Sequence, residues 1–190
     1  MYKVRNFNQL LGIKGLSDKL MQNHFSLYEG YVKNVNILIE LLDKKPGSVE
    51  YSELQRRFGW EFNGMRLHEL YFENLDKKQN LLATKSKIKK EIDRTYRSFK
   101  IWQKNYIAVG MMRGIGWVVL YYDPIAKELF NVWINEHDVG HFAGCQPLLV
   151  MDVFEHAYML DYGTKKADYI EMFIKNINWQ VVSNRFDKVK

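Results

Sequence analysis

The spacing of apolar residues predicts two long helices in the first half of the chain. Apolar side chains recur at three- and four-residue steps over residues 20–42, after a Ser17-Asp18 pair that is typical of a helix start. The Lys-Lys-Pro-Gly sequence of residues 44–47 stops this pattern, and a second one covers residues 52–75. Two amphipathic helices in this order can pack antiparallel as a hairpin.

The second half of the chain changes to a strand pattern after Gly114 and Gly116. Runs typical of strands at 117–122 and 129–134 flank an Asp-Pro turn and predict a β-hairpin, and residues 148–153 are a candidate third strand.

Helical patterns precede and follow these strands, at residues 92–94, 98–112 and 169–177. The order of the elements predicts an α+β fold. We expect an N-terminal helical hairpin domain at 1–90, which ends in a lysine-rich junction, and an α/β domain at 91–190.

Composition narrows the class of protein. The 190 residues are 47% apolar, yet no run approaches the roughly 20 uninterrupted apolar residues of a membrane helix, so we expect no membrane contact. The charged N-terminus lacks the apolar core of a signal peptide, and the single Cys145 cannot form an internal disulfide, so we expect a cytoplasmic protein. A net charge of +6 favours an anionic partner but is too dispersed to predict nucleic-acid binding.

Two of the five histidines, His24 and His68, lie on the apolar faces of the two predicted helices. A single histidine on such a face is usually a hydrogen-bonded core residue. Antiparallel packing can bring the two together, and two neutral imidazoles that converge in a core are hard to explain without a cation between them. Gly64 lies one turn before His68 and predicts a hole beside that imidazole.

Asp152 is a third candidate, because it follows the apolar run of residues 147–151. A carboxylate in such a place needs compensation for its burial, which a metal would provide. His156 is four residues later, so on a helical turn both side chains can point to one centre. From spacing alone, a metal site and a strand-to-helix junction capped by Asp152 explain the pattern equally well.

The Asp-Val-Phe-Glu-His-Ala-Tyr sequence of residues 152–158 resembles the signature of the iron and manganese superoxide dismutases. Residues 31–36 are similar to the tyrosine motif of that family's first helix, and residues 63–72 to the ligand motif of its second helix. Gly116-Trp117 resembles the start of the family's sheet, and residues 169–179 its closing helix. The resemblance implies a helical hairpin followed by an α/β domain with a three-stranded antiparallel sheet, and a metal site between them.

The resemblance also implies a ligand set and a reaction. One iron or manganese ion would be bound by His24, His68, Asp152 and His156, with a solvent molecule as fifth ligand. Superoxide would be converted to oxygen and hydrogen peroxide as the metal is alternately reduced and oxidised, with Tyr31 and His137 ordering the path of a proton. Val150, two residues before Asp152, favours iron. The alternative that the site accepts both iron and manganese stays open.

His24 and Tyr31 are seven residues apart, where the family usually has eight. Seven steps on a regular helix make nearly two whole turns, so both side chains already share a face, whereas eight would need a π-bulge. We therefore predict a plain α-helix here.

The family also carries a residue that hydrogen-bonds the metal-bound solvent, normally a glutamine from the second helix or the sheet. Gly64 occupies the helical place here. His137 matches the place where certain archaeal-type members have a histidine, and it is our candidate. Its neighbours Glu136 and His141 are the alternatives, although a carboxylate would repel a metal hydroxide unless it were protonated. A strand-end surface position for His137 also stays open.

The expected subunit contact departs from the family pattern. The gateway histidine and its tyrosine partner from the other subunit are absent, because Leu27 or Tyr28 and Met159 stand in their places. Glu155 matches the family glutamate that reaches the neighbouring subunit's ligand histidine, so we expect a homodimer or a dimer of dimers.

Two family tryptophans near the site are also replaced, by Phe154 and Val119, while Trp117 is present. The pocket should therefore stay apolar but be less filled.

Two other functions stay open from the sequence. A mononuclear iron oxygenase with two histidines and a carboxylate would need two open metal positions, and four protein ligands leave too few. A non-enzymatic basic helical module would bind nucleic acid through the lysines of residues 77–90, but no aromatic residues are interleaved there. Metal content distinguishes all three.

Overall fold

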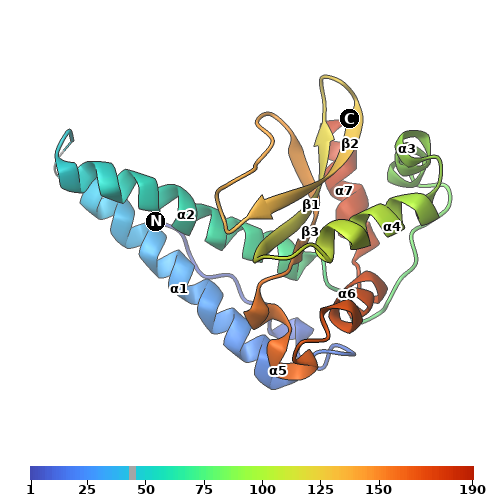
Figure 1. The fold of residues 1–190 in the computed structure, drawn as a ribbon, viewed down its shortest axis with the longest axis horizontal. Helices are drawn as coiled ribbons and strands as arrows, with labels where there is room; N and C mark the ends of the chain where they lie inside the picture. Colours follow the sequence, from blue (N-terminus) through green and yellow to red (C-terminus); the bar gives the residue numbers. More distant parts are fainter. Residues whose placement is uncertain (43–45) are drawn as a thin grey trace.

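The structure, a computed structural model, describes residues 1–42 and 46–190. Two antiparallel helices, α1 (Asp18–Leu42) and α2 (Val49–Glu73), form a hairpin that projects from the domain holding the sheet (Figure 1). Helix α1 therefore begins and ends as predicted. Pro46 and Gly47 of the predicted stop lie in a turn, whereas Lys44 and Lys45 lie outside the described residues.

Serine hydroxyls start both helices of the hairpin. Ser17 Oγ accepts the amide of Leu20 at 3.1 Å, and Asp161 accepts the backbone N–H and the hydroxyl of Ser17 at 2.6 and 2.7 Å. Helix α2 begins earlier than the predicted position 52, because Ser48 Oγ accepts the amide of Tyr51 at 3.0 Å and caps the helix. Its first turns are mostly exposed, so apolar periodicity does not reveal them.

The C-terminal part has the predicted α+β character, with a three-stranded antiparallel sheet in the order β2-β1-β3. Its elements are α3 (Lys87–Tyr96), α4 (Phe99–Gly110), β1 (Gly116–Asp123), β2 (Glu128–Asn135), β3 (Gln146–Asp152), α5 (Met159–Tyr162), α6 (Lys166–Lys175) and α7 (Trp179–Val189). Short 3-10 helices lie at Asn8–Leu10 and Glu155–Ala157. All three predicted strands are confirmed. The division into domains after residue 90 stays a prediction.

The C-terminus differs from the prediction. The expected helix at 169–177 is α6, which ends at Lys175, and the chain then forms a separate helix α7 that we did not predict. Asn178 starts α7 by accepting the amide of Val181 at 3.3 Å, and Val182 and Phe186 are buried one turn apart. Ile177 is buried as expected, but in a β-bridge with Leu75 rather than in a helix.

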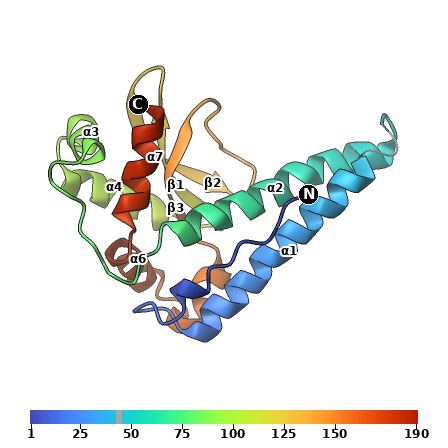
Figure 2. The same cartoon turned by 180° about the vertical axis from the view of Figure 1, so that it is seen from behind.

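The arrangement of the elements brings three chain segments to one place. Helix α2 packs against β3, and α1 contacts the Glu155–Ala157 turn. Seen from behind in Figure 2, α7 lies over the sheet, and α2 passes the lower end of the sheet and projects away from it, with α1 alongside. The first turns of α1, the last turns of α2 and the end of β3 meet at the junction between hairpin and sheet. None of the helices in the described ranges has the length and apolar character needed to span a bilayer.

Candidate metal centre

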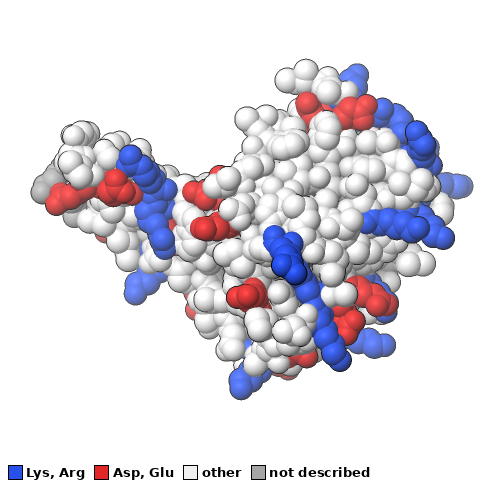
Figure 3. Space-filling model, in the orientation of Figure 1, with Lys and Arg blue, Asp and Glu red and all other residues white. Residues whose placement is uncertain are grey.

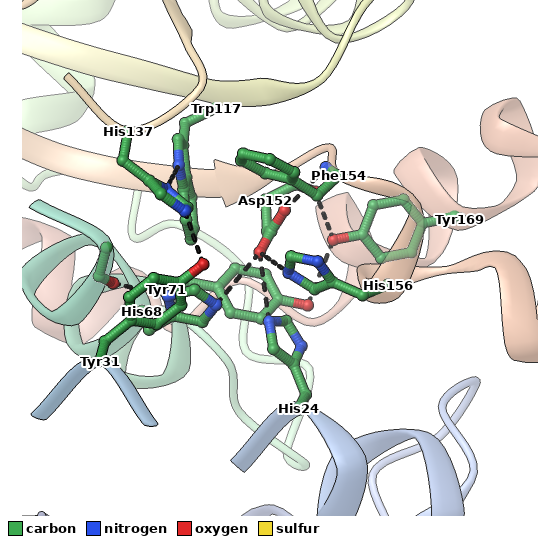
Figure 4. Close-up of polar contacts among 11 residues, drawn as sticks. His24, Tyr31, His68, Tyr71, Trp117, His137, Asp152, Phe154, His156 and Tyr169 are labelled. Atoms are coloured by element: carbon green, nitrogen blue, oxygen red, sulfur yellow. Dashed lines mark hydrogen bonds and ion pairs between the residues drawn. The ribbon is translucent and has the colours of Figure 1, made fainter. Parts of the chain in front are cut away.

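Four polar side chains converge where α1, α2 and the end of β3 meet. They are His24, His68, Asp152 and His156, and their ligand atoms all lie within 4.8 Å of one another. The Nε2 atoms of His24 and His156 are each 3.2 Å from Asp152 Oδ2, and Nε2 of His68 is 3.8 Å from it. Figure 4 shows the three imidazoles turned toward this one carboxylate. The predicted convergence of His24 and His68 is present, with ring centroids 5.0 Å apart.

The buried polar atoms of this cluster fit a bound cation. His68 Nδ1 donates to the Gly64 carbonyl at 2.6 Å, so in the neutral ring Nε2 carries a lone pair. That Nε2 has no hydrogen-bond partner among the described residues, and it faces the Asp152 carboxylate in a fully buried site. Two facing acceptors in a core are unfavourable without a positive charge between them. Three imidazole nitrogens and one carboxylate oxygen suit iron or manganese.

Three of the four side chains in the cluster favour the protonation state that a metal requires, and His156 is the exception. Burial lowers the pKa of His24, and it lowers the pKa of His68 well below the usual value. Burial alone would raise the pKa of Asp152, but His156 and His24 outweigh it and hold this pKa far below its usual range. For His156, Asp152 outweighs burial and raises the pKa. The carboxylate is therefore anionic, two imidazoles are neutral, and a metal has to displace a proton mainly at His156.

Asp152 serves both of the roles that the spacing left open. Its Oδ1 accepts the amide of Phe154 at 2.8 Å and caps the turn after β3, while Oδ2 faces the imidazoles. Its carbonyl accepts the hydroxyl of Tyr169 at 2.7 Å. His156 lies in the 3-10 turn Glu155–Ala157 rather than in a regular α-helical turn. The strand-to-helix junction and the candidate metal centre are therefore the same structure.

Tyr31 lies over the cluster from α1, which is α-helical at every residue from Asp18 to Leu42, so the predicted plain helix is confirmed. Its ring stacks on His68 with centroids 5.1 Å apart. A Cβ at Gly64 would lie 2.6 Å from Cδ1 of Tyr31. The hole that we predicted beside His68 is therefore filled, because the Tyr31 ring occupies the space that glycine leaves.

His137 connects Tyr31 to the sheet. The Trp117 indole N–H donates to His137 Nδ1 at 3.0 Å, and an indole nitrogen is only a donor. The proton of a neutral His137 therefore sits on Nε2, which lies 2.7 Å from the Tyr31 hydroxyl and donates to it. Burial lowers the pKa of His137 to about 4, so the ring is neutral at pH 7. The side chain is fully buried, which excludes the strand-end surface position.

The two neighbouring candidates have other partners. Glu136 Oε2 accepts the indole N–H of Trp60 at 3.0 Å. His141 Nε2 donates to the His137 carbonyl at 2.9 Å, and its Nδ1 accepts the Tyr121 hydroxyl at 2.8 Å. Of the three residues in this segment, His137 is the one that contacts Tyr31 (Figure 4).

Comparisons with known proteins agree with this geometry. A family model described as iron/manganese superoxide dismutases, C-terminal domain, matches residues 84–185. A protein named superoxide dismutase [Fe], from Cupriavidus metallidurans, is 36% identical over 181 residues, which cover 92% of this chain and 90% of the relative. The chain belongs to the iron/manganese superoxide dismutase family.

Other relatives widen the match within the superoxide dismutase family. A superoxide dismutase [Fe] from Aquifex pyrophilus is 34% identical over 93% of this chain and 86% of its own length. A superoxide dismutase [Mn] from Haloarcula marismortui is 29% identical over 89% of this chain and 84% of its own length. The resemblance read from residues 152–158 is thereby confirmed.

A surface pocket lies at the positions that the resemblance assigns to the family's gateway residues. Leu27 and Met159 are both exposed and line a surface pocket of about 560 Å³ together with Glu155 and His156. Tyr28 is instead buried, and its hydroxyl donates to Glu69 at 2.9 Å. The pocket gives solvent access to His156, whose side chain is 26% exposed.

Phe154, which we selected from the sequence, and two aromatic side chains that we did not select also surround the centre. Phe154 was expected to leave the pocket less filled, and its ring stacks on both His137 and His156, at 4.8 and 5.2 Å between centroids. Tyr71 lies 5.3 Å from the His24 ring, and Tyr169 contacts its hydroxyl at 3.2 Å. The position of Tyr71, one turn after His68, was the available signal.

The metal-free protein should lose stability between pH 6.5 and 4, partly through His137. Its pKa is about 4 when folded against 6.5 for an ordinary histidine, so the unfolded chain binds more protons in this interval. Each pH unit of acidification should then cost up to about 1.4 kcal/mol from this one group. Urea unfolding at a series of pH values gives the free energy of unfolding as a function of pH. The slope of this free energy against pH should be smaller for His137→Gln than for the wild type. Equal slopes would contradict the neutral, buried state of His137.

Proposed function

We propose that this protein converts two superoxide anions and two protons to oxygen and hydrogen peroxide, on one bound iron or manganese ion. The observation that carries the proposal is the set of three imidazoles around Asp152 Oδ2, two of them fully buried, with the lone pair of His68 Nε2 directed into it. Relatives named superoxide dismutase [Fe] and superoxide dismutase [Mn], similar over most of their length, support both the reaction and the choice of metal.

The ion would be held by the Nε2 atoms of three histidines and by one aspartate oxygen, from His24, His68, His156 and Asp152. When bound, it supplies one-electron redox chemistry between two oxidation states. Asp152 brings the negative charge, and Gly64 holds the His68 ring through the hydrogen bond from Nδ1 to its carbonyl. The buried aromatic surroundings keep bulk water away from His24, His68 and Asp152, whereas His156 is accessible from the surface pocket.

Tyr31 is suited to present a proton at the centre. His137 Nε2–H donates to the Tyr31 oxygen, so the hydroxyl's own proton is free to point to another acceptor. Burial raises the pKa of Tyr31 well above its usual value, which keeps the hydroxyl protonated at neutral pH. Trp117 fixes the tautomer of His137 and thereby the direction in which the hydrogen bonds run from Trp117 through His137 to Tyr31. We therefore assign Tyr31 and His137 to proton positioning and Trp117 to their support.

The other two functions receive less support. Four converging protein donors leave too few open positions for an oxygenase with two histidines and one carboxylate. The face in Figure 3 carries lysine and arginine dispersed among aspartate and glutamate, which does not favour a nucleic-acid interface there.

Metal analysis of the purified protein, followed by superoxide removal after loading with each metal, tests the proposal. We expect close to one iron or manganese per chain and loss of superoxide with either the iron or the manganese form. Val150, two residues before Asp152, leads us to expect the iron form to be the more active. Stoichiometric metal without superoxide removal would overturn the proposed reaction.

We further propose a homodimer, or a dimer of dimers, formed over the pocket beside Glu155. This exposed carboxylate lies next to the solvent-accessible edge of His156, among the apolar side chains of Leu27, Met159 and Leu160. A carboxylate from one copy that accepts from the ligand histidine of the other would raise the basicity of that ligand.

Glu155→Ala should therefore weaken both association and metal retention. Sedimentation velocity and the rate of metal loss to a chelator measure the two effects. Glu171→Ala is a matched control, because Glu171 is an exposed glutamate that pairs with Lys175 on α6. A monomeric wild type with full activity would contradict the proposed interface.

A further inference from the structure

Trp60 packs against the outer side of the Tyr31–His137 pair. It lies on α2, eight residues before His68, and is half-buried. Its ring centroid is 4.5 Å from that of His137 and 5.6 Å from that of Tyr31, while these two rings are 5.0 Å apart. Three rings, from α1, α2 and the turn after β2, thus contact one another, and two of them, Tyr31 and His137, also lie near the His68 ring.

Two polar contacts fix the orientation of the Trp60 ring. Its indole N–H donates to Glu136 Oε2 at 3.0 Å, which ties α2 to the turn that follows β2. The guanidinium of Arg57 lies 4.0 Å from its ring centroid, and Glu61 holds Arg57 through Oε1 at 2.8 and 2.6 Å. A cation over an indole face is favourable, so the ring is held both at its edge and on its face.

The hydrogen bond to Glu136 acts on the backbone that carries His137. Glu136 has φ = +49°, a left-handed conformation that a residue with a side chain adopts at a cost. The residue directly after it is His137, whose Nε2–H must point at Tyr31. A contact that holds the Glu136 side chain therefore also restrains the direction from which the His137 ring enters the core.

We propose that Trp60 is a positioning residue for the centre: through Glu136 and through its contact with the imidazole it keeps His137 Nε2–H directed at Tyr31. Trp60 and Glu136 act on the proton chain and not on the four metal-binding side chains. The consequence of this Trp60 role for turnover rests on the proposed function, whereas the geometry of the hydrogen bond between His137 and Tyr31 does not.

Nitrogen NMR of the metal-free protein, labelled with ¹⁵N in its five histidines, tests the inference without any activity measurement. His137→Gln identifies the His137 signals. In the wild type we expect a protonated Nε2, an unprotonated Nδ1 and slow exchange of the Nε2 proton with solvent. Trp60→Phe keeps a ring in place but removes the donor to Glu136, and Glu136→Ala removes the acceptor from an exposed site.

Both variants should exchange the His137 Nε2 proton about tenfold faster, the factor that corresponds to loss of one net hydrogen bond. Glu136→Gln retains an acceptor oxygen and should restore slow exchange. Trp133→Phe, at a half-buried tryptophan on β2, is the matched control and should resemble the wild type. Wild-type exchange in both Trp60→Phe and Glu136→Ala would overturn the inference, even in a protein with full dismutase activity. An inactive protein with the expected exchange rates would overturn only the proposed function.

Discussion

A His68→Ala variant is expected to be purified with almost no iron or manganese and to remove no superoxide. His68 is fully buried, its Nδ1 is fixed by the Gly64 carbonyl, and its Nε2 is directed at the Asp152 carboxylate. Without this ring, three donors cannot close the site, and the Tyr31 ring loses the surface on which it stacks. Elemental analysis after loading with each metal measures the effect.

The control for this variant is His141→Ala, which removes a half-buried imidazole that lies outside the cluster. It should keep a metal content near that of the wild type. Circular dichroism of both variants separates metal loss from unfolding, and His68→Gln repeats the test with a side chain that fills more of the space. A folded His68→Ala protein with unchanged metal content would remove His68 from the ligand set.

His137→Ala should have the second largest effect on superoxide removal. Unlike His68→Ala, it should act without loss of the metal. The four metal-binding side chains stay, but Trp117 and Tyr31 lose the ring that joins them. Both ring nitrogens of His137 bond neutral groups, the Trp117 indole N–H and the Tyr31 hydroxyl, and a neutral hydrogen bond contributes about 0.5–1.5 kcal/mol net. For a one-electron couple that is roughly 20–65 mV at 59 mV per tenfold change in equilibrium constant. We therefore expect the variant to keep its metal, to shift its potential by no more than this amount and to lose most of its turnover.

Redox titration of the loaded protein and superoxide removal together check this expectation. His141→Ala serves again as the control, since His141 touches His137 only at the backbone carbonyl in the contacts described above. If His137→Ala kept its potential and rate while Glu136→Ala or His141→Ala lost them, the role assigned to His137 would belong to that neighbour.

The sequence predicted which polar side chains converge at the candidate metal centre better than it predicted their surroundings. Periodicity placed His24 and His68 on apolar faces, and antiparallel packing of α1 and α2 is enough to bring them together. Asp152 stood out because a carboxylate after an apolar run needs compensation for the burial of its charge. Three imidazoles lie close enough to provide it, directly or through a bound cation. These inferences depend on local hydrophobic pattern and on charge, and both can be read from the amino-acid sequence.

Features that depend on tertiary contacts were harder to predict. Trp60 carries no pattern that links it to His137, because the two residues meet only when α2 packs beside the turn after β2. The tautomer of His137, in the turn after β2, follows from Trp117, a donor on β1. Helix α7 was missed because its buried face is narrow and its cap, Asn178, follows closely on α6.

The contact between Gly64 and Tyr31 restricts how position 64 can be changed. Cδ1 of the Tyr31 ring lies 2.6 Å from where a Cβ at position 64 would be, so a glutamine there requires the ring to shift. Such a shift would alter the stacking of Tyr31 on His68 and its hydrogen bond with His137. Engineers who introduce a glutamine on α2 in place of His137 should therefore alter α1 and α2 together.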